Sequence, residues 1–116
     1  MSTERIIPDL TCQSLPLAAR FYQDVLGLEP VMDHGWIMTL ADPWQPRCQL
    51  SLLTQDQTAA ANPVVSIQVD DVDAAYSAAV KAGAEIVHPL TDEPWGVRRF
   101  FVRDPDGNVL NILSHR

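Results

Sequence analysis

The stretch "VVSIQVDDVDAAYSAAVKAGAEIVH", residues 64–88, predicts a strand, a capped helix and a second strand in direct succession. Its apolar start is followed by two aspartates, a residue type that caps helix N-termini. Val72, Ala75 and Ala79 then recur at helical spacing, and Gly83 is placed to end the helix. The stretch therefore predicts a βαβ segment of an α+β fold.

Residues 6–31, "IIPDLTCQSLPLAARFYQDVLGLEPV", repeat this plan at the start of the chain. An apolar strand leads to Ser14 as a helix cap, Pro16 lies in the first helical turn, and Gly27 ends the helix. The apolar positions at helical spacing are Leu17, Ala18, Phe21, Tyr22 and Val25. The repetition predicts that the chain consists of two copies of one structural unit.

Three strand-like runs follow each predicted helix. They cover residues 28–32, 36–40 and 47–54 in the first half and residues 85–88, 97–103 and 108–114 in the second. We therefore predict two tandem βαβββ modules, at about 5–54 and 64–114, in a single domain of 116 residues. The polar stretch "QDQTAAANP", residues 55–63, reads as the linker. A sheet with one helix leaves its other face uncovered, so the two mixed sheets are expected to form a cleft.

Composition limits the partners. A formal net charge of -7 disfavours nucleic acid, because an acidic surface repels phosphate backbones. No secretory h-region and no run of eighteen apolar residues is present, so we expect no membrane partner and a cytoplasmic location. Cys12 and Cys48 lack a CxxC spacing and are expected to be reduced, mostly buried thiols.

Three motifs resemble a known family. They are "FYQDVLGLEPV" (21–31), "VDDVDAAYSAAVKAGAEIV" (69–87) and "EPWGVRRFFVRDPDGNVLNI" (93–112), and in this order they resemble the glyoxalase, bleomycin-resistance and ring-cleaving dioxygenase superfamily, also called vicinal oxygen chelate. The resemblance implies the glyoxalase/bleomycin-resistance fold. It also implies a homodimer, in some members with exchanged modules.

In the metal enzymes of this superfamily, a divalent ion is held near the start of the first strand of each module and by a Glu on the last strand. The resemblance places these positions at Ile7, Val64 and Asn111. Aliphatic side chains offer no lone pair, and a lone amide oxygen is a weak donor, so we expect no metal cofactor. A shift of two residues would instead offer Asp9, with Ser66 or Gln68. His34, His88 and His115 are placed at turns or the C-terminus and are expected to be surface residues.

Strand alternation selects the side chains that would face the cleft. In "VRRFFVR", Phe100 and Val102 suit the helix side, which leaves Arg99 and Phe101 for the cleft. Three tryptophans at strand edges or in loops are expected at the rim, where a planar ligand could stack on them. The candidate ligand-binding residues are Asp9, Trp36, Trp44, Gln68, Trp95, Arg99, Phe101 and Asn111. No nucleophile elbow or phosphate loop is present, so no catalytic residue is assigned.

These observations favour metal-free binding or sequestration of a small molecule, such as a planar or cationic antibiotic, as in the drug-sequestering branch of the superfamily. Two alternatives remain open. One is a metal-dependent lyase, isomerase or ring-cleaving dioxygenase that binds its ion through shifted ligands such as Asp9. The other is a dimeric scaffold with a collapsed cleft.

Overall fold

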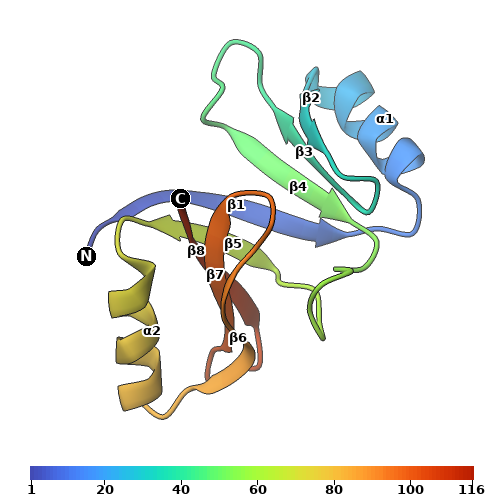
Figure 1. The fold of residues 1–116 in the computed structure, drawn as a ribbon. Helices are drawn as coiled ribbons and strands as arrows, with labels where there is room; N and C mark the ends of the chain where they lie inside the picture. Colours follow the sequence, from blue (N-terminus) through green and yellow to red (C-terminus); the bar gives the residue numbers. More distant parts are fainter. The chain divides into compact units, whose positions relative to one another are not determined.

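The computed structural model describes residues 1–116, which form two compact units. One unit is residues 7–58, and the other combines residues 1–6 with residues 59–116. Each unit has one helix and a mixed sheet (Figure 1). The elements in chain order are β1 (Thr3–Thr11), α1 (Leu15–Leu26), β2 (Glu29–Asp33), β3 (Ile37–Ala41), β4 (Gln49–Leu53), β5 (Val65–Val69), α2 (Val72–Lys81), β6 (Glu85–Asp92), β7 (Val97–Arg103) and β8 (Val109–His115).

The sheet of the 7–58 unit has the strand order β2-β3-β4-β1. β1 runs parallel to β4, with Asp9 opposite Ser51, and the other neighbours are antiparallel. Helix α1 covers one face of this sheet, where Leu15 and Ala19 pack with Leu40 into a buried cluster. Alternation along the strands therefore sends Asp9 and Ser51 to the face that α1 does not cover.

The sheet of the other unit has the order β5-β8-β7-β6, with the first residues of β1 beside β5. The Asp70 N–H donates to the Ser2 carbonyl over 3.0 Å, which ties the N-terminus to the end of β5. Helix α2 packs on one face, where Val72 and Phe100 are buried and the Tyr76 and Phe100 rings meet edge to face at 5.0 Å.

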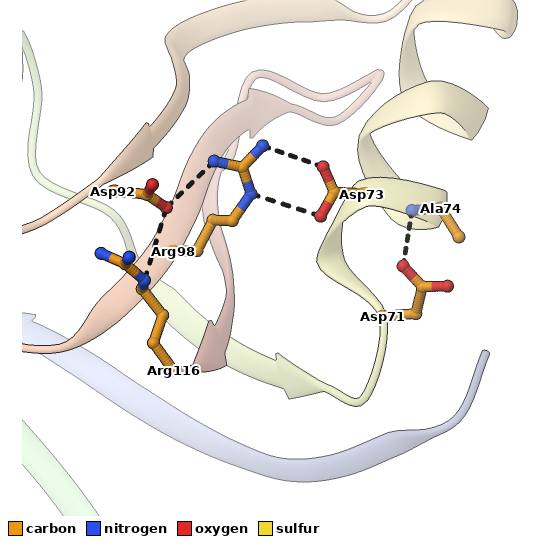
Figure 2. Close-up of polar contacts among 6 residues, drawn as sticks. All are labelled: Asp71, Asp73, Ala74, Asp92, Arg98 and Arg116. Atoms are coloured by element: carbon orange, nitrogen blue, oxygen red, sulfur yellow. Dashed lines mark hydrogen bonds and ion pairs between the residues drawn. The ribbon is translucent and has the colours of Figure 1, made fainter.

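Polar contacts attach the first turn of α2 to the strands beside it (Figure 2). Asp71 caps the helix by accepting from the Ala74 N–H over 3.0 Å. The Arg98 guanidinium on β7 donates to both carboxylate oxygens of Asp73, over 2.9 and 3.2 Å, and to Asp92 on β6 over 3.0 Å. A two-bonded arginine–carboxylate contact fixes orientation as well as distance. The helix is therefore oriented on its sheet by charge as well as by packing.

The predicted fold class is confirmed: each unit follows the βαβββ plan, with both helices at the predicted places. Ser14 caps α1, and Gly27 ends it in a left-handed conformation with φ 69°. One predicted strand end is wrong. β6 continues past His88 to Asp92, because irregular pairing with β7 at His88 lets the strand bend and run on.

Two further expectations are corrected by burial. Cys48 is exposed in the loop before β4, and Cys12 is half-buried beside the α1 cluster. His88 lies within β6 with its side chain only 12% exposed, whereas His34 and His115 are exposed as expected. None of the helices is long and apolar enough to cross a membrane.

Candidate functional site

Strand β7 presents two different sets of side chains on its two faces. Phe100 belongs to the cluster under α2, so Arg99 and Phe101 point to the opposite face of the sheet, as the alternation predicts. Both are buried, with Arg99 5% exposed and Phe101 fully covered. We call this face of the 59–116 sheet, which α2 does not cover, the ligand face, because the predicted ligand-binding residues Arg99 and Phe101 lie on it.

A charged and aromatic group lies on the ligand face, and we call it the Arg99 cluster. Its members are His88, Glu93, Trp95, Arg99 and Phe101. The carbon at the centre of the Arg99 guanidinium lies 5.1 Å from the Trp95 ring centroid and 4.7 Å from that of Phe101. Contacts of this length are favourable cation–π interactions. The cation is therefore held against aromatic surface on the ligand face.

Glu93 supplies the negative charge of the cluster. One of its carboxylate oxygens, Oε1, lies 2.9 Å from His88 Nε2 and 3.4 Å from Arg99 Nε. Glu93 is only 5% exposed, and a buried carboxylate is costly unless it is paired. The His88 ring also packs against Phe101, at 5.3 Å between centroids. The cluster is thus electrically balanced and packed from several sides.

Asn111 lies beside the cluster on β8, directly opposite Phe101 on β7 and Ser66 on β5. Its Nδ2 donates to Ser66 Oγ over 3.0 Å, while its buried Oδ1 has no hydrogen-bond partner. Asn111 is 9% exposed, so its Oδ1 lacks the hydrogen bond that burial normally demands.

Gln68 lies on the same sheet but its amide is already used. Its oxygen accepts from the Arg5 guanidinium over 2.9 Å, and its nitrogen donates to Glu4 over 3.1 Å. Both partners come from β1, so Gln68 ties the N-terminal strand to β5. This predicted binding residue has a structural task.

The other predicted residues belong to the 7–58 unit. Asp9 is 5% exposed and lies in register with Ser51, whose hydroxyl shares a 2.8 Å hydrogen bond with Thr39. Trp36 is half-buried immediately before β3. Trp44 is 88% exposed in the loop between β3 and β4. Of the predicted residues, the structure brings Trp95, Arg99, Phe101 and Asn111 together in one unit, whereas Asp9, Trp36 and Trp44 lie in the other unit.

Glu93 and His88 are functional candidates that sequence reasoning missed. The irregular pairing around His88 breaks the period of two along β6, so alternation gives no reliable face for this histidine. Glu93 follows the strand directly, and its role depends on side chains that reach it from β6 and β7. Their spacing of five in "HPLTDE" is the one local signal that could have suggested a pair.

The donor set does not fit the divalent ion of the superfamily's metal enzymes. Ile7 is aliphatic, Val64 precedes β5 and is 49% exposed, and the strand neighbour of Asn111 is Ser66. A hydroxyl and an amide are neutral and weak ligands compared with carboxylate and imidazole. No group of three or more His, Cys, Asp or Glu side chains is arranged to hold a metal.

Comparison with known proteins places this fold in a family. The family model of the Glyoxalase/Bleomycin resistance protein/Dioxygenase superfamily matches residues 6–112. The chain belongs to this superfamily. The resemblance that the three sequence motifs suggested is therefore confirmed.

Solved structures share the superfamily fold at low sequence identity. A superfamily member from Vibrio splendidus 12B01 is 21% identical, with 97% of this chain and 99% of that chain covered and a TM-score of 0.73. An NAD-dependent benzaldehyde dehydrogenase from Legionella pneumophila is 20% identical, with coverages of 96% and 99% and a TM-score of 0.75. A methylmalonyl-CoA epimerase from Mycobacterium tuberculosis is 16% identical, with coverages of 98% and 87% and a TM-score of 0.69. These likenesses show the fold alone.

Curated relatives include uncharacterized proteins of Mycobacterium bovis and Mycobacterium tuberculosis, both 32% identical over 79 residues. The match covers 68% of this chain and 52% and 46% of those proteins, so the chain spans about half the length of the curated relatives it matches.

Proposed function

We propose that this superfamily member binds a small organic molecule on the ligand face of the 59–116 unit, without a metal and without transforming it. The observation that carries the proposal is Asn111. The resemblance puts this residue where the metal enzymes have their Glu ligand, and the side chain here is a buried amide with one atom lacking a partner. A polar group of a ligand would supply the missing hydrogen bond and recover the cost of burying that atom.

The Arg99 cluster supports an organic ligand with a flat apolar part. Trp95 is half-buried and already faces a planar guanidinium, so a planar ligand group could pack on its exposed part. Arg99 and Glu93 balance each other, so the site itself does not require an anionic ligand. The net charge of -7 attracts cations at longer range, which favours cationic planar compounds, antibiotics among them.

The test is a binding screen of planar organic compounds, including cationic antibiotics, read by tryptophan fluorescence. We expect at least one compound to change the emission, and we expect Trp95→Phe to reduce that change. Asn111→Ala should weaken binding about tenfold, the usual effect of one lost buried hydrogen bond. Gln57→Ala, which removes an exposed amide in the linker, is the matched control and should bind like the wild type.

Two further measurements separate sequestration from catalysis. Mass spectrometry of the ligand after prolonged incubation should recover it unchanged. Elemental analysis and titration with Zn, Ni, Mn and Fe should show neither near-stoichiometric metal nor tight rebinding. A consumed ligand, or a tightly bound metal, would overturn the proposal and favour a metal-dependent lyase, isomerase or dioxygenase. If Asn111→Ala bound the ligand as tightly as the wild type, Asn111 would not be part of the binding site and the proposed site would be wrong.

A further inference from the structure

The hydrogen-bonding atoms of the ligand face differ in whether the protein itself provides their partner. Glu93 Oε1 lies 2.9 Å from His88 Nε2 and 3.4 Å from Arg99 Nε, so the charges of this cluster are matched within it. Asn111 is matched at one end only. Its Nδ2 donates to Ser66 Oγ over 3.0 Å, whereas the buried Oδ1 accepts no hydrogen bond. The position that the protein leaves open beside Asn111 is therefore that of a donor.

Ser66 determines which end of the Asn111 amide is left over. The two residues lie directly opposite each other on β5 and β8, which brings the hydroxyl to the amide nitrogen. A primary amide has a donor nitrogen and an acceptor oxygen, so holding the nitrogen leaves the oxygen. A ligand N–H or O–H would bond to this oxygen and recover the cost of burying it without a partner, whereas an ether, ketone or carboxylate oxygen would place lone pairs against lone pairs.

We propose that the ligand face selects planar molecules by a hydrogen-bond donor, an N–H or O–H group at the edge of a flat ring, which Asn111 Oδ1 accepts. This inference rests on the proposed function and names the chemical class of its ligand. Heterocycles with a ring N–H, phenols and protonated aromatic amines belong to the class, whereas ring ethers and aromatic carboxylates do not. Ser66 is then a positioning residue, because it acts on the ligand only through the orientation of the Asn111 amide.

The surroundings of Asn111 favour a ligand with few polar groups. Asn111 lies directly opposite Phe101, whose ring centroid is 4.7 Å from the central guanidinium carbon of Arg99. Each further polar group of a ligand would lose its water beside this aromatic surface, at a cost unless it found a partner of its own. The amide oxygen is neutral, so it accepts from uncharged donors as well as from cations. The hydrogen bond can therefore be tested with uncharged compounds, apart from the long-range effect of the net charge.

The test compares indole, benzofuran and indene, which are uncharged, flat and nearly equal in size. Indole donates one N–H, benzofuran has an ether oxygen in its place, and indene has neither. Each compound is titrated into the isotope-labelled full chain, and binding is followed by the NMR signals of the ligand face, including the side-chain amide of Asn111. We expect indole to bind about tenfold more tightly than indene, the effect of one buried hydrogen bond, and benzofuran to bind no more tightly than indene.

Two variants assign this preference to the residues. Asn111→Leu keeps the approximate shape of the side chain without an acceptor, so it should bind the three compounds about equally. Ser66→Ala frees the amide to turn, so the ratio of indole to benzofuran affinity should fall. Gln57→Ala should keep the order of the wild type.

The outcomes separate this inference from the function on which it rests. Equal affinities of the wild type for indole and benzofuran, with the ligand-face signals shifting, would overturn the donor preference and leave planar binding intact. An unchanged preference in Asn111→Leu would also overturn it, because the acceptor would then lie elsewhere. If none of the three compounds shifted the ligand-face signals, the proposed function would fail and this inference with it.

Discussion

At the scale of single residues, the two thiols differ in reactivity. Burial raises the pKa of the Cys12 thiol, which packs beside the α1 cluster, whereas Cys48 is exposed. A raised pKa lowers the thiolate fraction at a given pH, and the thiolate is the reactive form. We expect iodoacetamide at mildly alkaline pH to alkylate Cys48 first and Cys12 more slowly, as followed by mass spectrometry. In Cys48→Ser only the slow reaction should remain, and equal rates at the two thiols would contradict the burial argument.

The sequence predicts the face on which a side chain lies where the strand is regular. Arg99, Phe101 and Asn111 lie on the face that alternation assigns to them, because β7 and β8 pair without interruption. The resemblance places a metal-ligand position of the superfamily at Val64, but this residue precedes β5, and Ser66 is the strand neighbour of Asn111. His88 and Glu93 escape prediction because their contact depends on the irregular pairing of β6 with β7, which breaks the alternation along the strand.

At the scale of elements, the attachment of α2 to β7 makes the structure sensitive to acid. The Arg98 hydrogen bonds hold the pKa of Asp73 below its usual range, and Asn108 does the same for Asp104 in the turn between β7 and β8. When the pKa of a carboxylate is lower in the folded than in the unfolded protein, the ionised group stabilises the fold. This stabilisation is complete above the unfolded pKa, about 4, and is lost as the pH falls through the lower folded pKa.

The melting temperature of the wild type should therefore fall as the pH drops below about 4, the unfolded value of an aspartate. Asp73→Asn should start from a lower melting temperature at neutral pH and lose less on acidification, as thermal unfolding followed by circular dichroism would show. The control is Asp106→Asn. Asp106 is an exposed residue of the turn between β7 and β8, and this variant should follow the wild type. Identical acid profiles for wild type and Asp73→Asn would show that this ion pair contributes nothing measurable.

The existence of both helices follows from the sequence, but the role of their faces does not. Ser14 and Asp71 cap them and Gly27 ends the first, as the residue types predict. Along α1, however, two apolar stripes have equal periodicity, and a single helix gives no means to decide which one meets the sheet. Which face of α1 meets the sheet is decided by β3 and β4, where Leu40 and Leu52 pack against Leu15 and Ala19.

At the scale of the whole molecule, the internal repeat predicts two similar units, and the structure adds how the chain is distributed between them. The boundary between the compact units falls within β1, after Ile6, and again after Thr58. A strand that serves two units is not visible in its own sequence, because residues 3–11 read as one uninterrupted extended run. The duplication can be read from the sequence pattern, whereas the sharing of β1 between the two units depends on which strands pair with it.

The sharing of β1 has a consequence for cutting the chain. A break in the segment after Thr58 would leave the piece 59–116 without residues 1–6, and β5 would lose the neighbour that Arg5 and Gln68 help to hold. An unpaired strand edge can pair with other extended chains.

We expect 59–116 alone to aggregate, and co-expression with 1–58 to give a soluble complex by complementation. A co-expressed piece that begins at Ile7 should fail to rescue it, and rescue by that piece would contradict the role given to β1. We therefore expect the two pieces to fold together as separate chains, because 1–58 carries the strand segment that completes the 59–116 unit.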